Sequence, residues 1–145
     1  MADPRLLADL QEAEGCRLIA YRDSRGFWTI GYGHFLDQSI DWTGQVWTLD
    51  MALQALALDV DTAAEAAMGL PEWAALDTPC RQNAVIELIF NMGVHTWTTF
   101  KMTRASIQSQ DWQAAHDNLL TGPWHSQVGP TRSQRLADYL LSGSY

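Results

Sequence analysis

The stretch of sequence that decides the fold lies at residues 14–34 and reads EGCRLIAYRDSRGFWTIGYGH. It opens with Glu14 followed by a glycine, a pair typical of a helix end. The turn-forming run Asp23-Ser24-Arg25-Gly26 then leads into aromatic and β-branched residues with glycines two positions apart. The stretch therefore predicts a helix that ends at Glu14 and gives way to a hairpin or small sheet.

The segments on both sides of this stretch read as helices. Asp3 before Pro4 pairs a capping residue with a first-turn proline, and the apolar stripe behind them predicts a helix over residues 4–14. The helical period returns at residues 48–69. Further helices are expected at residues 79–92, 100–109, 112–120 and 131–141. The predicted fold class is therefore α+β and predominantly helical, with its β patch near the N-terminus.

The composition indicates one compact domain and excludes several classes of protein. The 145 residues are 47% hydrophobic and 18% charged, enough apolar material for a core. A formal net charge of -8 argues against binding to nucleic acid, which depends on neutralising phosphates. No apolar run is long enough to span a membrane, and no secretory signal is visible, so we expect the protein to start in the cytoplasm. Cys16 and Cys80 are expected to be buried free thiols.

Glu14, Asp23 and Thr29 are the candidate catalytic residues. A carboxyl group at a helix end and a second one on a hairpin can flank a glycosidic bond, one as proton donor and the other to align a water molecule. From spacing alone, the simpler interpretation is that Glu14 is a helix-end charge and Asp23 a turn former, because the chain has 17 acidic residues.

The surrounding residues closely resemble the signature of the phage-type lysozymes, the endolysins of glycoside hydrolase family 24. That family reads Glu-Gly-x-Arg, then Tyr-x-Asp, then Gly-x-x-Thr-Ile-Gly-x-Gly-His, and every position is matched between Glu14 and His34. The resemblance continues through most of the chain, in Asp59-Val60-Asp61, Phe90-Asn91-Met92-Gly93, Phe100 and residues 129–135.

This resemblance implies a single lysozyme-like domain over residues 1–145, with two lobes and a glycan-binding cleft between them. After the first helix at residues 4–14, the small N-terminal β-sheet lobe would cover about residues 15–47. The interlobe helix would cover about residues 48–69, and the C-terminal helical lobe about residues 70–145.

Carried over residue by residue, the resemblance assigns the catalytic roles. Glu14 would be the general acid, Asp23 would help to hold the attacking water, and Thr29 would position that water through its hydroxyl group. The family favours inversion, in which the two carboxyl groups stand roughly 6.5 to 9.5 Å apart.

The resemblance also implies supporting residues. Arg132 matches a basic residue that approaches the catalytic glutamate, and His34 is expected to pair with Asp59. Residues expected at or near the glycan cleft are Asn91, Phe100, Thr103 and Asn118, with Trp28 as a candidate for stacking on sugar. The alternative for these five is ordinary packing or capping. No metal site and no cofactor are expected, because no other His or Cys falls at ligand spacing from His34.

The resulting hypothesis is an N-acetylmuramidase that cleaves the β-1,4 bond between N-acetylmuramic acid and N-acetylglucosamine in peptidoglycan. We expect a monomeric phage endolysin, held in the host cytoplasm until a holin permeabilises the membrane. It would bind peptidoglycan glycan strands, without nucleic acid and without inserting into the membrane. The alternatives are a peptidoglycan-binding module of the same fold that does not cut, and a cell-wall enzyme carried on the virion.

The acidic charge is uneven along the chain. Residues 46–80 hold six acidic and no basic side chains, whereas residues 81–145 are close to neutral. If four of the five basic residues of the helical lobe gather near the cleft, their local potential would suit an anionic glycan. These residues are Lys101, Arg104, Arg132 and Arg135.

Overall fold

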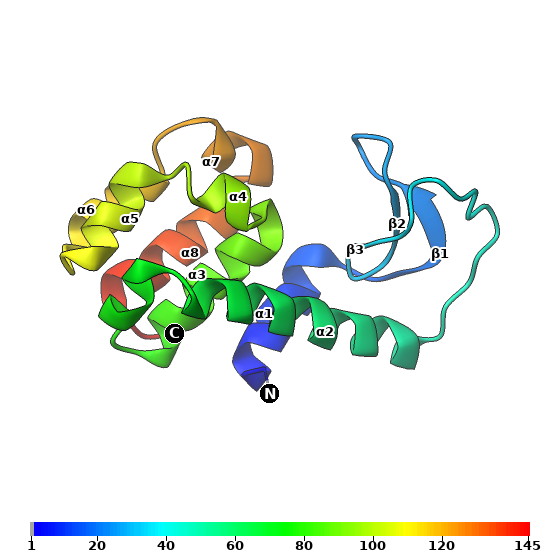
Figure 1. The fold of residues 1–145 in the computed structure, drawn as a ribbon, viewed down its shortest axis with the longest axis horizontal. Coiled ribbons are helices and arrows are strands. Elements are labelled where there is room, and N and C mark those ends of the chain that lie inside the picture. The colour runs from blue at the N-terminus through cyan, green and yellow to red at the C-terminus, as the bar shows by residue number, and fades with distance from the viewer. Residues whose placement is uncertain (1) are drawn as a thin grey trace. The chain divides into compact units, whose positions relative to one another are not determined.

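The computed structural model describes residues 2–145, which form two compact units. The N-terminal unit ends at Thr62, and the C-terminal unit begins at Ala63. The boundary falls inside the long helix α2 (Leu49–Met68), which is drawn in green in Figure 1. The other elements are, in order, α1 (Pro4–Glu14), β1 (Arg17–Arg22), β2 (Trp28–Gly31), β3 (His34–Phe35), η1 (Pro71–Ala75), α3 (Pro79–Met92), α4 (Val94–Trp97), α5 (Lys101–Gln108), α6 (Trp112–Leu119), α7 (Pro123–Val128) and α8 (Pro130–Ser142). The predicted α+β, predominantly helical fold class is confirmed.

Helix α1 begins and ends at the residues that the sequence predicts. The side chain of Asp3 accepts a hydrogen bond from the backbone N–H of Arg5 at 2.8 Å, and Pro4 occupies the first turn. Gly15 ends the helix with a φ of 65°, a conformation that side chains disfavour. Because Gly15 stops the helix there, Glu14 lies at its last position.

The sheet is a three-stranded antiparallel meander in the order β1-β2-β3. Thr29 in the central strand is paired with Tyr21 on one side and with Phe35 on the other. Directly opposed residues of antiparallel strands share a face, so these three side chains lie on the same face of the sheet. Strand β2 packs closely on α2, since a Cβ atom added to Gly31 would lie 3.2 Å from the Cβ atom of Ala52.

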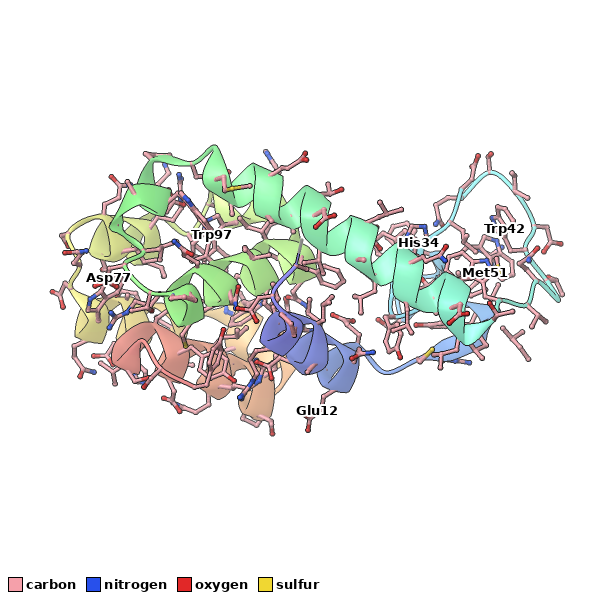
Figure 2. The ribbon with its side chains drawn as sticks, turned by 90° about the horizontal axis from the view of Figure 1, so that it is seen from below. Glu12, His34, Trp42, Met51, Asp77 and Trp97 are labelled. Carbon is pink, nitrogen blue, oxygen red and sulfur yellow. The ribbon has the colours of Figure 1, made fainter. Side chains whose placement is uncertain are left out.

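The C-terminal unit is a cluster of helices around the largely buried α3. Helix α8 packs against α3 and α6, and α6 also packs against α5 (Figure 1). Trp97 lies inside this unit and is fully buried (Figure 2). Other fully buried side chains in it are Leu88, Ile107, Leu119, Leu136 and Leu140.

A buried carboxylate joins three elements of the C-terminal unit. Glu72, in η1, is fully buried and accepts hydrogen bonds from Trp97 at 2.9 Å and from Arg104 at 2.7 and 3.0 Å. Burial disfavours the ionised form of Glu72, but these hydrogen bonds outweigh it and hold its pKa below the usual value. Glu72 is therefore a charged structural link inside the helical core.

Three short elements of the C-terminal unit, η1, α4 and α7, differ from the sequence interpretation, which left their residues between the predicted helices. Each spans six residues or fewer, too short for an apolar period to appear. Helix α8 begins at Pro130, one residue earlier than predicted, because Gly129 with a φ of 87° turns the chain just before it.

Removing the Arg104 charge tests the buried link. Arg104→Met leaves the Glu72 carboxylate without its charged partner, so we expect the free energy of unfolding to fall by about 3 kcal/mol. Urea denaturation followed by circular dichroism measures the change. Gln113→Ala is the control, since it removes only an exposed hydrogen bond to Asp117. Equal stability of the two variants would contradict the structural role of this link.

Candidate active site

Glu14 is held at the junction between α1 and the sheet. Its side chain is half-buried, and a Cβ atom added to Gly33 would lie 3.1 Å from Oε2 of Glu14. Gly33 also has a φ of 75°, which favours glycine. The missing side chain at residue 33 therefore gives the carboxylate room beside the turn between β2 and β3.

Asp23 uses one carboxylate oxygen to build the turn that precedes β2. Its Oδ1 accepts hydrogen bonds from the backbone N–H groups of Arg25 and Phe27, both at 2.9 Å. This geometry fixes the direction of the side chain. No side chain or backbone group in residues 2–145 donates a hydrogen bond to Oδ2, so the second oxygen can accept one from water or substrate.

Thr29 points from β2 on the face shared with Tyr21 and Phe35. It is 2% exposed, and its hydroxyl group donates to the carbonyl oxygen of Phe27 at 2.9 Å. Because the hydroxyl proton is already used, the lone pairs of Oγ1 remain to accept a hydrogen bond from water. Thr29 and Asp23 are thus connected through the two backbone groups of a single residue, Phe27.

Tyr21 lies within electrostatic range of both candidate catalytic carboxylates. Its pKa is raised, first by partial burial and then by the negative charges of Glu14 and Asp23, while Arg17 opposes the shift. The guanidinium of Arg17 lies 3.8 Å from the centre of the Tyr21 ring. Both carboxylates therefore act electrostatically on Tyr21, a residue of the family motif for which the sequence predicted no role.

His34 and Asp59 form the expected pair within the N-terminal unit. Nδ1 of His34, which is labelled in Figure 2, lies 2.8 Å from Oδ2 of Asp59 on α2. The imidazole ring also contacts Trp47, with ring centres 5.5 Å apart. The hydrogen bond to Asp59 raises the pKa of His34, against the opposing effect of partial burial. The pair fixes the chain directly after Gly33 on α2.

Arg132 belongs to a buried ion-pair cluster of the C-terminal unit. Its Nε donates to Glu87 at 2.9 Å, and Arg135 donates to both oxygens of the same carboxylate at 3.0 and 2.8 Å. Glu87 is 1% exposed and sits in the apolar run of α3, where the sequence gave no signal for it. The approach of Arg132 to the catalytic glutamate stays a prediction.

The remaining glycan-contact candidates differ in exposure. Asn91 accepts a hydrogen bond from Trp124 at 2.8 Å, and the half-buried Phe100 stacks on Trp97 with ring centres 5.8 Å apart. Thr103 is 2% exposed, which favours a packing role over contact with a glycan. The half-buried Asn118 donates to Ser106 at 3.0 Å.

Trp28 is also mainly a packing residue. It is 6% exposed, and the guanidinium of Arg22 lies 4.4 Å from its ring centre. Its backbone N–H and carbonyl groups are both hydrogen-bonded to the side chain of Gln38. This environment favours the packing alternative over sugar stacking.

Of the two cysteines, which the sequence predicts to be buried, only Cys80 is. Cys80 is buried as expected and forms no disulfide bond, but Cys16 is exposed, because it lies in the open connection between α1 and β1. Over residues 2–145, His, Cys, Asp and Glu form no group of three or more placed to hold a metal ion. None of the helices in the described part of the chain is long and apolar enough to cross a membrane.

Comparisons with known proteins give consistent matches. A family model described as phage lysozyme matches residues 11–137. The probable T4-type lysozyme 1 of Dictyostelium discoideum is 26% identical over 93% of this chain and 92% of its own length. The endolysin of Salmonella phage P22 is 33% identical over 77% of this chain and 75% of its own length. The peptidoglycan hydrolase gp36 of Pseudomonas phage phiKMV is 25% identical over 87% of this chain, which corresponds to 14% of that protein.

The His34–Asp59 pair predicts a pH dependence of stability. The pKa of His34 is higher in the folded state than its unfolded value of about 6.5, so folding favours the protonated form. The resulting stabilisation, about 1 kcal/mol or less for a partly exposed pair, is complete below pH ~6.5. This stabilisation is lost as the pH rises through the raised pKa of His34.

Urea denaturation of the wild type and of His34→Asn between pH 5 and 9 measures this contribution. The difference in unfolding free energy between the two proteins should shrink as the pH rises. A difference that stays constant over this range would contradict the ionised pair.

Proposed function

Because the chain belongs to the phage lysozyme family, we propose that residues of the N-terminal unit carry its chemistry, with Glu14 as the proton donor. The protein is a peptidoglycan-hydrolysing lysozyme, a glycoside hydrolase of the phage endolysin type. The bond cleaved would be the β-1,4 bond between N-acetylmuramic acid and N-acetylglucosamine. The observation that carries this proposal is the half-buried Glu14 carboxylate beside Gly33, with Tyr21 in electrostatic range of both it and Asp23.

The proposed reaction is a single displacement with inversion. Glu14 donates its proton to the glycosidic oxygen as that bond breaks, and a water molecule attacks the anomeric carbon from the opposite side of the sugar. Asp23 accepts a hydrogen bond from this water through Oδ2 and takes up its proton as the new bond forms. Thr29 accepts the second hydrogen bond from the water. With both of its protons held, the water molecule directs a lone pair toward the anomeric carbon.

The supporting roles are proposed on the same basis. His34 and Asp59 would hold the turn beside Glu14, and Arg132 would be an organising residue through its bond to Glu87. Asn91, Phe100 and Asn118 remain candidates for glycan contact, because their half-buried side chains stay partly accessible.

The cellular role is proposed to be that of a monomeric endolysin, held in the host cytoplasm until a holin gives it access to the cell wall. The names of the phage relatives support this role. A module that only binds peptidoglycan is the less favoured alternative, since the Glu14, Asp23 and Thr29 set is intact and pure binding needs no proton donor. A virion-associated enzyme is the other alternative.

Replacing the proposed acid tests the reaction. Glu14→Gln should lower the rate of peptidoglycan digestion by at least about 100-fold, because the amide has no proton to donate to the leaving oxygen. Mass spectrometry of the products should find muropeptides with N-acetylmuramic acid at the reducing end for the wild type.

Glu12→Gln is the matched control, with the same change of charge on an exposed position of α1 (Figure 2). Equal product from a folded Glu14→Gln variant would refute the role of this residue.

Asp23 allows its structural and chemical roles to be separated. Asp23→Asn keeps an oxygen that can accept the N–H bonds of Arg25 and Phe27, so the turn and the melting temperature should be preserved. The turnover number should nevertheless fall by about 100-fold or more, since an amide is not a base. Asp23→Ala should lose both activity and thermal stability. Full activity of Asp23→Asn would exclude a catalytic role of the carboxylate.

A further inference from the structure

Several of the cationic side chains form ion pairs with carboxylates of the same chain. Among residues 2–145, ion pairs with Asp or Glu engage five arginines, namely Arg5, Arg81, Arg104, Arg132 and Arg135. The local positive potential expected from the helical lobe is therefore largely offset, because three of its five basic residues, Arg104, Arg132 and Arg135, neutralise buried carboxylates. On the hairpin of β1 and β2, by contrast, the described part of the chain places no acidic partner within ion-pair distance of Arg22 or Arg25.

The guanidinium group of Arg25 lies over two exposed aromatic rings, those of Phe27 and Phe35. Its guanidinium lies 5.0 Å from the ring centre of Phe27 and 6.0 Å from that of Phe35. The two rings contact each other edge to face at 5.9 Å, and they are 40% and 53% exposed. A planar guanidinium held over aromatic rings keeps its N–H groups available for a carboxylate.

This aromatic pair is joined directly to the proposed catalytic residues. The N–H group of Phe27 donates to Asp23, its carbonyl oxygen accepts from Thr29, and Phe35 is the strand partner of Thr29. The backbone N–H of Arg25 also donates to Asp23. Arg25 and the two phenylalanines therefore adjoin the proposed position of the attacking water, on the sheet face that carries Thr29.

Arg22 lies on the other face of the same sheet. It is the strand partner of Trp28, which precedes Thr29 and so points the opposite way. Its guanidinium stacks on Trp28 and donates to the carbonyl oxygen of Gly26 at 3.0 Å. Arg22 is thus a neighbouring arginine of equal charge that points away from the candidate site.

We propose that Arg25, backed by Phe27 and Phe35, binds a carboxylate of the peptide stem carried by the N-acetylmuramic acid residue next to the scissile bond. The proposal rests on the proposed function, and it names the part of the substrate that this face recognises. In peptidoglycan the carboxylates lie on the peptide stems, whereas the sugar backbone is uncharged. With a net charge of -8, the protein needs a local cation to hold such a group. The exposed phenylalanines offer an apolar surface to the aliphatic start of the stem.

The test compares two soluble tetrasaccharide fragments of peptidoglycan, one with free stem carboxylates and one with those carboxylates amidated. The wild type should hydrolyse the free form with a kcat/KM about tenfold higher, the size expected from one charge-assisted contact at an accessible site. Arg25→Gln should abolish this preference through KM, and Arg25→Glu should reverse it in favour of the amidated fragment. Arg22→Gln should keep it, although it removes the same charge from the same hairpin.

The outcomes separate this inference from the proposed function. Hydrolysis of neither fragment by the wild type would refute the muramidase assignment itself. Equal hydrolysis of both fragments by the wild type would refute only the role of Arg25, as would an unchanged preference in Arg25→Gln and Arg25→Glu. Equal loss of preference in Arg22→Gln would show a general effect of hairpin charge and would also refute the inference. Because Arg25 lies in an exposed turn, the melting temperatures of the Arg25 variants should match that of the wild type.

Discussion

The organisation of the N-terminal unit depends on the close approach of the Glu14 carboxylate to the backbone at Gly33. A Cβ atom at residue 33 would lie 3.1 Å from Oε2, a contact tight enough to push the carboxylate from its place. Gly15 places the carboxylate at the last position of α1, and the bond between His34 and Asp59 fixes the residue after Gly33 on α2. The Glu14 carboxylate thus lies at a helix end and beside a strand turn that is itself hydrogen-bonded to a second helix.

Local features of this arrangement were predictable from the sequence, and contacts between distant residues were not. Asp3, Pro4 and Gly15 act within a few residues of one another, so the bounds of α1 followed from their order. The resemblance to a known family predicted Glu14, Asp23 and Thr29 as catalytic residues, and it correctly predicted the pairing of His34 with Asp59. Nothing local shows that Glu87, inside an apolar run, receives Arg132 and Arg135 from more than 40 residues away. Thr103 and Trp28 show the same limit, because their burial depends on how whole helices and strands pack.

The two units use their arginines differently. In the C-terminal unit, Arg104, Arg132 and Arg135 are bound to the buried carboxylates of Glu72 and Glu87. Such pairs fix how helices pack, because leaving either charge unpartnered inside the core is costly. On the hairpin, arginines rest on aromatic rings at the surface, where their charge remains accessible. A strongly acidic chain can therefore present positive charge on the hairpin surface, although arginines elsewhere are neutralised by buried carboxylates.

The exposure of Cys16 gives the protein a chemical handle that requires no mutation. Cys16 is accessible and lies two residues after Glu14, whereas Cys80 is buried at 3% exposure. Under native conditions a thiol-reactive fluorophore or spin label should therefore attach at a single position beside the end of α1. The chain carries its own attachment point for a reporter of substrate arrival.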